Sequence, residues 1–153
     1  MIIEYQRPTN LSEALRLLAR KHPLSYPLGG GTNLNRGMDG QIAVVDLQSL
    51  GLGATTTKGN LLLVGATVTL QGLLEKEGLA DDINKAIKHE VTYNLRQMAT
   101  VAGKLVTADG RSPFATAMLA LDASLEVLEL DKKPIQLRLG IGYHCGRVHP
   151  MGS

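Results

Sequence analysis

Two glycine-bearing segments are the residues of this chain best suited to chemistry. The first is Leu28-Gly29-Gly30-Gly31-Thr32-Asn33-Leu34 and the second is Ala99-Thr100-Val101-Ala102-Gly103-Lys104. Glycine allows positive φ values and lets a ligand approach the backbone closely. Two such loops that face each other would present backbone N–H groups to an anion such as a diphosphate. Taken singly, the first segment is equally consistent with a plain turn, and the second is more typical of a structural element.

A few other polar residues have two interpretations each. Asp109 precedes Gly110, a pair typical of turns, so Asp109 either supports a turn or contacts a ligand. Asp46 follows an apolar run, and we expect it to cap the next turn rather than to take part in a reaction. Arg96 is expected to form an ion pair or to pin the second loop, with a direct ligand contact as the alternative. Nothing in the sequence indicates a nucleophile with its base, so no catalytic side chain is predicted.

Three candidate metal ligands gather near the end of the chain. They are His144, Cys145 and His149, and they lie in a stretch without periodicity. Metal ligands need defined spacing on an ordered scaffold, which this stretch does not indicate. No metal site is therefore predicted.

The composition narrows the class of protein. Of 153 residues, 44% are hydrophobic and 20% are charged, which is typical of a globular domain. A net charge of +2 and an aromatic content of 3% argue against a nucleic-acid partner. No apolar run approaches the roughly 20 residues that span a bilayer, and the N-terminus lacks a signal-peptide pattern. The lone cysteine, Cys145, favours a cytoplasmic location.

The first loop is expected to be held by a β-α-β-β lobe formed by residues 1–53. Residues 2–6 alternate weakly and predict a strand, and apolar residues at helical spacing predict a helix over residues 11–21 that begins at the N-cap Asn10. A short extended stretch over residues 26–28 leads into the glycines. The β-branched, apolar run Ile42–Asp46 predicts a buried strand.

A second lobe with mixed α and β elements is expected over residues 54–139. Gly59-Asn60 separates two extended runs and predicts a hairpin, and Ser112-Pro113 is typical of a helix start. The predicted elements are strands 55–58 and 61–64, helices 70–76, 82–88 and 113–121, and strands 125–130 and 134–139. Residues 140–153 are interpreted as an irregular tail outside the fold.

Taken together, these segments resemble a known flavoprotein family. The matching stretches are residues 27–34, 44–47, 64–69 and 95–103, followed by the helix from Pro113 and Asp122-Ala123. In this order they are similar to the FAD-binding domain of the molybdenum hydroxylases, as in the medium subunit of carbon monoxide dehydrogenase and the flavin region of xanthine dehydrogenase. The wider fold is that of flavoproteins of the p-cresol methylhydroxylase type.

The resemblance implies an α+β, two-lobed domain with FAD extended in the cleft between the lobes. Residues 28–34 would surround the diphosphate with amides, residues 100–104 would approach from the other lobe, and Asp109 would reach a ribose hydroxyl. Hydrogen bonds to an ionised diphosphate are strong. The implied cofactor-binding residues are Leu28, Gly29, Gly30, Gly31, Thr32, Asn33, Leu34, Thr100, Val101, Ala102, Gly103, Lys104 and Asp109.

The chain departs from the family pattern at three points. The family usually has Gly-Gly-Asn where this chain has Ala102-Gly103-Lys104, and often an acidic residue in place of Pro113. Ala102 is a small change if its φ is negative and a costly one if φ is positive. The chain also has about half the family's length.

The resulting hypothesis is an FAD-binding electron-transfer subunit of a molybdenum hydroxylase. Its expected partners are a molybdenum-cofactor subunit and an iron–sulfur subunit, and the flavin would pass electrons to an acceptor such as NAD or a quinone. Two alternatives are a truncated scaffold that binds a partner but no flavin, and a self-contained flavin oxidase or reductase.

Overall fold

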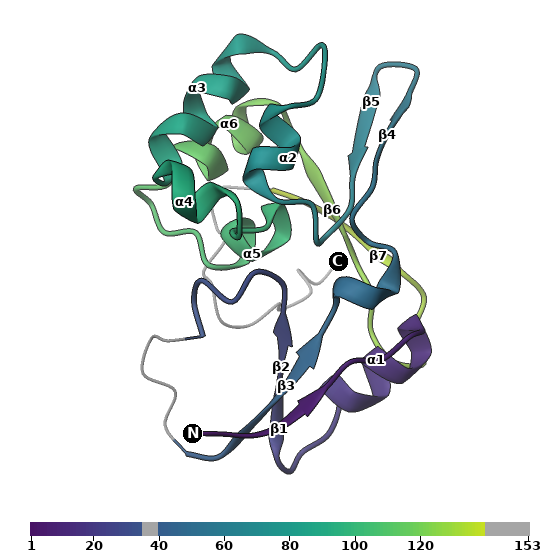
Figure 1. The fold of residues 1–153 in the computed structure, drawn as a ribbon. Helices are drawn as coiled ribbons and strands as arrows, with labels where there is room; N and C mark the ends of the chain where they lie inside the picture. Colours follow the sequence, from purple (N-terminus) through teal and green to yellow (C-terminus); the bar gives the residue numbers. More distant parts are fainter. Residues whose placement is uncertain (35–39, 140–153) are drawn as a thin grey trace.

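The computed structural model describes residues 1–34 and 40–139, which form two lobes (Figure 1). The irregular tail expected over residues 140–153, with His144, Cys145 and His149, lies outside the described residues. The placement of the boundary between residues 53 and 54 stays a prediction. Within the described parts, no helix has the length and apolar character needed to cross a membrane.

The first lobe has the predicted β-α-β-β order and a three-stranded parallel sheet. Its elements are β1 (Ile2–Gln6), α1 (Leu11–Leu18), β2 (Leu24–Leu28), β3 (Ile42–Asp46) and the short 3₁₀ helix η1 (Gln48–Leu50). The strand order is β1-β3-β2, so the central strand is β3, and all five of its residues are buried. A strand enclosed in this way is expected to be a continuous apolar run.

Helix α1 begins where the sequence predicts and ends earlier than predicted. The side chain of Asn10 accepts a hydrogen bond from the Glu13 N–H, which makes Asn10 the N-cap. The prediction extended the helix to Lys21, but it ends at Leu18. The chain turns there, and the Arg20 guanidinium reaches back to Glu4 on β1 at 2.9 Å.

The second lobe combines two hairpins with a group of short helices. Its elements are β4 (Thr55–Lys58), β5 (Leu61–Val64), α2 (Leu70–Leu74), α3 (Asp81–Glu90), α4 (Tyr93–Arg96), α5 (Val101–Val106), α6 (Pro113–Ala120), β6 (Ser124–Val127) and β7 (Ile135–Arg138). Both hairpins are antiparallel. In Figure 1 the hairpin of β4 and β5 projects beside the helices. Strand β6 ends at Val127 rather than Leu130, because its pairing with β7 begins at Ile135.

The second lobe has a hydrophobic core of its own. Phe114, the single phenylalanine of the chain, is fully buried, as are Leu70 and Ile87. The buried set consists of Val68, Leu70, Leu73, Ile87, Ala99, Val101, Leu105 and Phe114. Since these residues come from the helices and from the segments between them, the core fixes α5 in the orientation in which it meets the first lobe.

Candidate binding site between the two lobes

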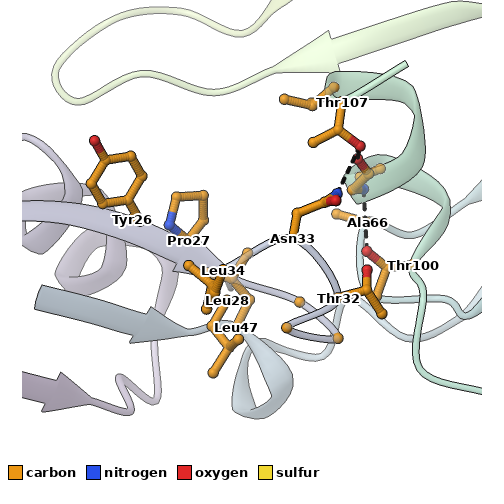
Figure 2. A pocket seen from close by; sticks show the side chains of 16 residues that line it. Tyr26, Pro27, Leu28, Thr32, Asn33, Leu34, Leu47, Ala66, Thr100 and Thr107 are labelled. Atoms are coloured by element: carbon orange, nitrogen blue, oxygen red, sulfur yellow. Dashed lines mark hydrogen bonds between the residues drawn. The ribbon is translucent and has the colours of Figure 1, made fainter. Parts of the chain in front are cut away.

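A pocket of about 290 Å³ lies where the glycine segment of the first lobe meets α5 of the second (Figure 2). Its volume is at the lower end of the range for ligand pockets, so it suits part of a large ligand. The residues that line it are Tyr26, Pro27, Leu28, Gly29, Gly30, Gly31, Thr32, Asn33, Leu34, Leu47, Ala66, Thr100, Ala102, Gly103, Val106 and Thr107. The structure therefore brings ten of the thirteen predicted site residues together.

Unpaired backbone amides are the main polar feature of the first-lobe side. Within the part of the chain that the structure describes, the N–H groups of Gly29, Gly30, Gly31, Thr32 and Asn33 donate to no protein acceptor. All five residues are half-buried. Amides without a protein acceptor at the wall of a pocket are available to an acceptor from outside the chain, either water or a ligand oxygen.

The pocket has no charged lining side chain among the described residues. Among the described residues, the attraction for an anion therefore comes from the amide dipoles, which act strongly where water is partly excluded. Around them the lining is mostly apolar, with Tyr26, Leu28 and Leu47 on one side and Val106 on the other. This combination suits a ligand with a compact anionic group joined to apolar groups.

The second glycine segment is not a loop, contrary to the sequence-based interpretation. Residues 101–106 form α5, and the Thr100 hydroxyl caps it by accepting from the Gly103 N–H at 3.2 Å. A threonine at this position followed by apolar residues at helical spacing is a helix start. Because Ala102 lies in the first turn of α5, its φ is negative, and the alanine is accommodated without strain.

Gly29 and Gly30 of the first segment are required by the packing of the lobes. A Cβ on Gly30 would lie 1.5 Å from the Met98 carbonyl oxygen, and one on Gly29 would lie 2.8 Å from Thr100 Oγ1. Gly31 is the member of this segment with a positive φ, +71°. We expected all three glycines to serve backbone conformation and ligand approach. For Gly29 and Gly30 the nearest obstacle is instead the second lobe.

One hydrogen bond joins the lobes across the pocket. Asn33 Nδ2 donates to Thr107 Oγ1 at 2.8 Å, and Thr107 Oγ1 in turn donates to the Gly103 carbonyl at 2.8 Å. Figure 2 shows the Asn33 side chain pointing from the glycine segment toward Thr107. Two contacts therefore join the lobes at the pocket: the close approach of Gly30 to the Met98 carbonyl and the hydrogen bond from Asn33 to Thr107.

Three predicted site residues do not line the pocket. The side chain of Val101 belongs to the core of the second lobe. The Lys104 ammonium lies 2.8 Å from Glu90 Oε1. The exposed Asp109 carboxylate accepts bonds from the N–H and the guanidinium of Arg111, which lower its pKa. The turn interpretation of Asp109 matches this arrangement, and a ligand role for these three residues stays a prediction.

Glu90 is a buried carboxylate that holds the helices next to the site. Besides Lys104, it accepts from Ser112 Oγ at 2.8 Å and from the Phe114 N–H at 3.1 Å. Burial raises the pKa of Glu90, but the bonds from Lys104, Phe114 and Ser112 outweigh it, so the pKa lies below its ordinary value of 4.5. Glu90 thus joins the end of α3 to α5 and to the start of α6.

A second group of polar residues, none of which lines the pocket, supports the glycine segment. Asp46 Oδ1 accepts from the Gln48 N–H at 2.9 Å, which confirms the predicted turn cap. Its other oxygen accepts from the Tyr5 hydroxyl, and this bond raises the pKa of the tyrosine. Gln48 Nε2 donates to the Gly29 carbonyl at 3.0 Å.

Arg96 was expected to form an ion pair or to pin the second glycine segment. In the structure its guanidinium contacts Gln71 at 3.4 Å and lies over the Tyr93 ring.

Sequence reasoning did not predict six of the lining residues. They are Tyr26, Pro27, Leu47, Ala66, Val106 and Thr107. Pro27, Leu47 and Ala66 lie in stretches that carried the family resemblance, so they had a signal. Val106 and Thr107 follow from the helical nature of α5, because residues 3–4 apart lie on one face of a helix. Among the described residues no His, Cys, Asp and Glu side chains form a group of three suited to a metal.

Comparison with known proteins identifies relatives of the chain. The profile of the family described as "FAD binding domain in molybdopterin dehydrogenase" matches residues 1–139. The uncharacterized protein YgfM of Escherichia coli K12 is 28% identical over 128 residues, covering 82% of this chain and 49% of YgfM. The carbon monoxide dehydrogenase medium chain of Afipia carboxidovorans is 27% identical over 134 residues, covering 81% and 46%.

Solved structures show the same fold. A carbon monoxide dehydrogenase from Hydrogenophaga pseudoflava that lacks the Mo-pyranopterin moiety of its cofactor aligns with a TM-score of 0.81 at 20% identity. The alignment covers 91% of this chain and 51% of that one. The chain thus spans about half the length of the relatives it matches.

Proposed function

Because the chain belongs to the family of FAD-binding domains of molybdopterin dehydrogenases, whose cofactor is FAD, we propose that its pocket holds the FAD diphosphate. We also propose that the bound flavin transfers electrons within a molybdenum hydroxylase. The observation that carries the proposal is the run of five free amides at residues 29–33, in a pocket whose described lining residues carry no charge. These groups match an ionised diphosphate, which needs several donors at close range.

The residues have distinct proposed roles. The amides of residues 29–33 donate to diphosphate oxygens, and Thr32 adds its hydroxyl. Thr100, Ala102 and Gly103 close the pocket from the second lobe, and the apolar lining residues enclose the parts of FAD next to the diphosphate. FAD supplies the redox chemistry when it is bound, while the protein binds and orients it.

The proposed setting is a multi-subunit enzyme. A relative of this chain is the medium chain of carbon monoxide dehydrogenase, and we propose that this chain likewise serves a molybdenum-cofactor subunit and an iron–sulfur subunit. The lone cysteine fits a cytoplasmic location for such an assembly.

The pocket is tested by one filling substitution and a matched control. Ala102→Leu places a larger side chain at the pocket wall, whereas Ala120→Leu makes the same change on the exposed end of α6. After free flavin is removed, absorbance near the flavin's usual ~370 and ~450 nm reports the FAD retained by each protein. We expect wild type and Ala120→Leu to retain FAD and Ala102→Leu to bind it at least about 10-fold more weakly.

Two results contradict the proposal. The first is a folded wild-type chain that retains no FAD at any concentration tested. The second is equal FAD affinity in Ala102→Leu and Ala120→Leu.

A second experiment tests the diphosphate contact directly. In amide NMR spectra, ADP should shift the resonances of residues 29–33, and adenosine, which lacks the diphosphate, should leave them in place.

A further inference from the structure

Gln48 contacts the glycine segment without lining the pocket. Its side-chain amide donates to the Gly29 carbonyl at 3.0 Å, while Gly29 and Gly30 themselves face the pocket. The two residues are 19 positions apart, so the folding of β2 beside β3 brings them together. This bond fixes a carbonyl in a stretch of three glycines, where the backbone would otherwise have the most freedom.

The position of Gln48 is itself fixed by its neighbours. Its N–H donates to the buried carboxylate of Asp46 at 2.9 Å, and that carboxylate also accepts from the Tyr5 hydroxyl. The Arg7 guanidinium lies 3.7 Å from Asp46 and donates to Ser49 Oγ at 2.7 Å. Groups from β1, β3 and η1 therefore hold the backbone of Gln48 in place before any ligand arrives, and its exposed side chain reaches the Gly29 carbonyl from this fixed position.

The geometry of the peptide group connects this bond to the pocket. In a trans peptide, the C=O of one residue and the N–H of the next point in opposite directions. With the Gly29 oxygen held by Gln48, the Gly30 N–H points away from Gln48, and Gly30 lines the pocket. The Gly30 N–H is one of the five free amides.

We propose that Gln48 is a positioning residue, which holds the Gly29–Gly30 peptide so that the Gly30 N–H faces the diphosphate of the ligand. The inference rests on the proposed FAD site and adds a residue that touches no ligand. A carboxylate at position 48 would place an acceptor against the Gly29 carbonyl and would favour rotation of this peptide. A protonated carboxyl can donate as the amide does.

The decisive experiment uses this difference between the two protonation states. FAD affinity of the 153-residue chain is measured from about pH 7.5 to about pH 4, which crosses the ordinary pKa of a glutamate, for wild type, Gln48→Glu, Gln48→Met and the control Gln136→Glu, a change on β7 in the other lobe. Thermal unfolding at each pH verifies that every protein is folded. Two charged groups neighbour residue 48: the Asp46 carboxylate, which accepts from its backbone N–H and favours a higher pKa for the introduced carboxyl, and Arg7, which lies 3.7 Å from Asp46 and favours a lower one.

We expect Gln48→Glu to bind FAD about 10-fold more weakly than wild type near neutral pH and to recover as the pH falls. Gln48→Met should be weaker at every pH, and Gln136→Glu should follow wild type. In the ligand-free chain, Gln48→Met should also move the Gly30 ¹⁵N resonance, because that nitrogen belongs to the peptide whose carbonyl loses its donor.

The possible failures are distinguishable. Wild-type affinity in both Gln48 variants, with FAD bound by wild type, overturns the positioning role and leaves the FAD site intact. Equal weakening of Gln48→Glu and Gln48→Met at every pH also overturns it, since a merely structural defect would not respond to protonation. Absence of FAD binding in wild type overturns both proposals.

Discussion

Gly30→Ala is the substitution that most directly tests why the first segment contains glycine. The added Cβ would lie 1.5 Å from the Met98 carbonyl oxygen and 2.4 Å from the Met98 carbonyl carbon. Cβ atoms essentially never approach within 3.0 Å of such atoms, so the glycine segment and the second lobe must separate by more than 1 Å. Both obstructing atoms belong to the backbone, so no side-chain rotation relieves the contact.

The expected cost follows from the overpacking that this contact creates. Forcing an extra carbon into a packed contact destabilises a protein by about 1–3 kcal/mol, and the rigidity of both partners here favours the upper half, about 2 kcal/mol or more. For a domain of this size, 1 kcal/mol corresponds to a shift of roughly 2–4 °C in Tm. Ligand-free Gly30→Ala is therefore expected to unfold roughly 4–8 °C below wild type, in thermal scans followed by circular dichroism.

The control is Gly110→Ala. Gly110 has no atom within 4 Å of an added Cβ, and its φ lies outside the positive range, so alanine is accommodated there. Its Tm should equal or slightly exceed that of wild type, since alanine reduces the freedom of the unfolded chain. If ligand-free Gly30→Ala has the Tm of wild type and differs only in FAD affinity, Gly30 serves ligand approach alone and the argument from lobe packing is wrong.

Three further predictions concern hydrogen-bonded side chains of the second lobe. The folded-state pKa of Glu90 lies below its ordinary value of 4.5, so the stability that the Glu90 carboxylate contributes is complete above pH 4.5 and is lost as the pH falls through the folded-state pKa. In urea titrations, Glu90→Gln should therefore lose less stability on acidification than wild type. Parallel curves of stability against pH for the two proteins would refute this prediction. Ser112→Ala removes the cap of α6 and a partner of Glu90, so the free energy of unfolding should fall by about 1–2 kcal/mol, and an unchanged urea midpoint would contradict it. Thr107→Val removes the hydroxyl that accepts the exposed hydrogen bond from Asn33, which should lower the free energy of unfolding by no more than about 1 kcal/mol. FAD should dissociate faster from this variant than from wild type in stopped-flow measurements. An unaltered dissociation rate would show that this hydrogen bond does not hold the pocket closed.

The elements were largely predictable because their signals are local. The apolar run Ile42–Asp46 reports a strand buried on both faces, and Asn10 and Ser112 mark helix starts through bonds to residues three positions away. The ends were less predictable. Helix α1 ends at Leu18, where the chain turns and Arg20 reaches Glu4. Strand β6 ends at Val127, where its pairing with β7 stops. A local sequence pattern contains neither of these contacts.

The site was predictable to the extent that it lies in continuous motifs. Residues 28–34 all line the pocket, whereas Lys104, predicted from the family resemblance, pairs with Glu90. Gln48 was not predicted at all, since a glutamine in a turn has no chemical signature. Its importance arises from the parallel pairing of β2 and β3, which places Gln48 beside Gly29.

The glycine segment, residues 29–31, serves both the packing of the lobes and the proposed binding of the diphosphate. Because the same residues serve both, the two properties are coupled. Gly30 gives the second lobe room to pack against the segment, while its N–H stays free at a pocket formed by both lobes. A ligand that contacts both lobes binds the packed state better than any separated one, so at a free ligand concentration L it stabilises the packed state by up to RT ln(1 + L/Kd), which is about 2.7 kcal/mol when L is 100 times Kd. By the same linkage, a substitution that separates the lobes weakens FAD binding without touching FAD. Affinity alone therefore cannot identify the residues that contact the diphosphate, and only variants that lose affinity while keeping ligand-free stability do so.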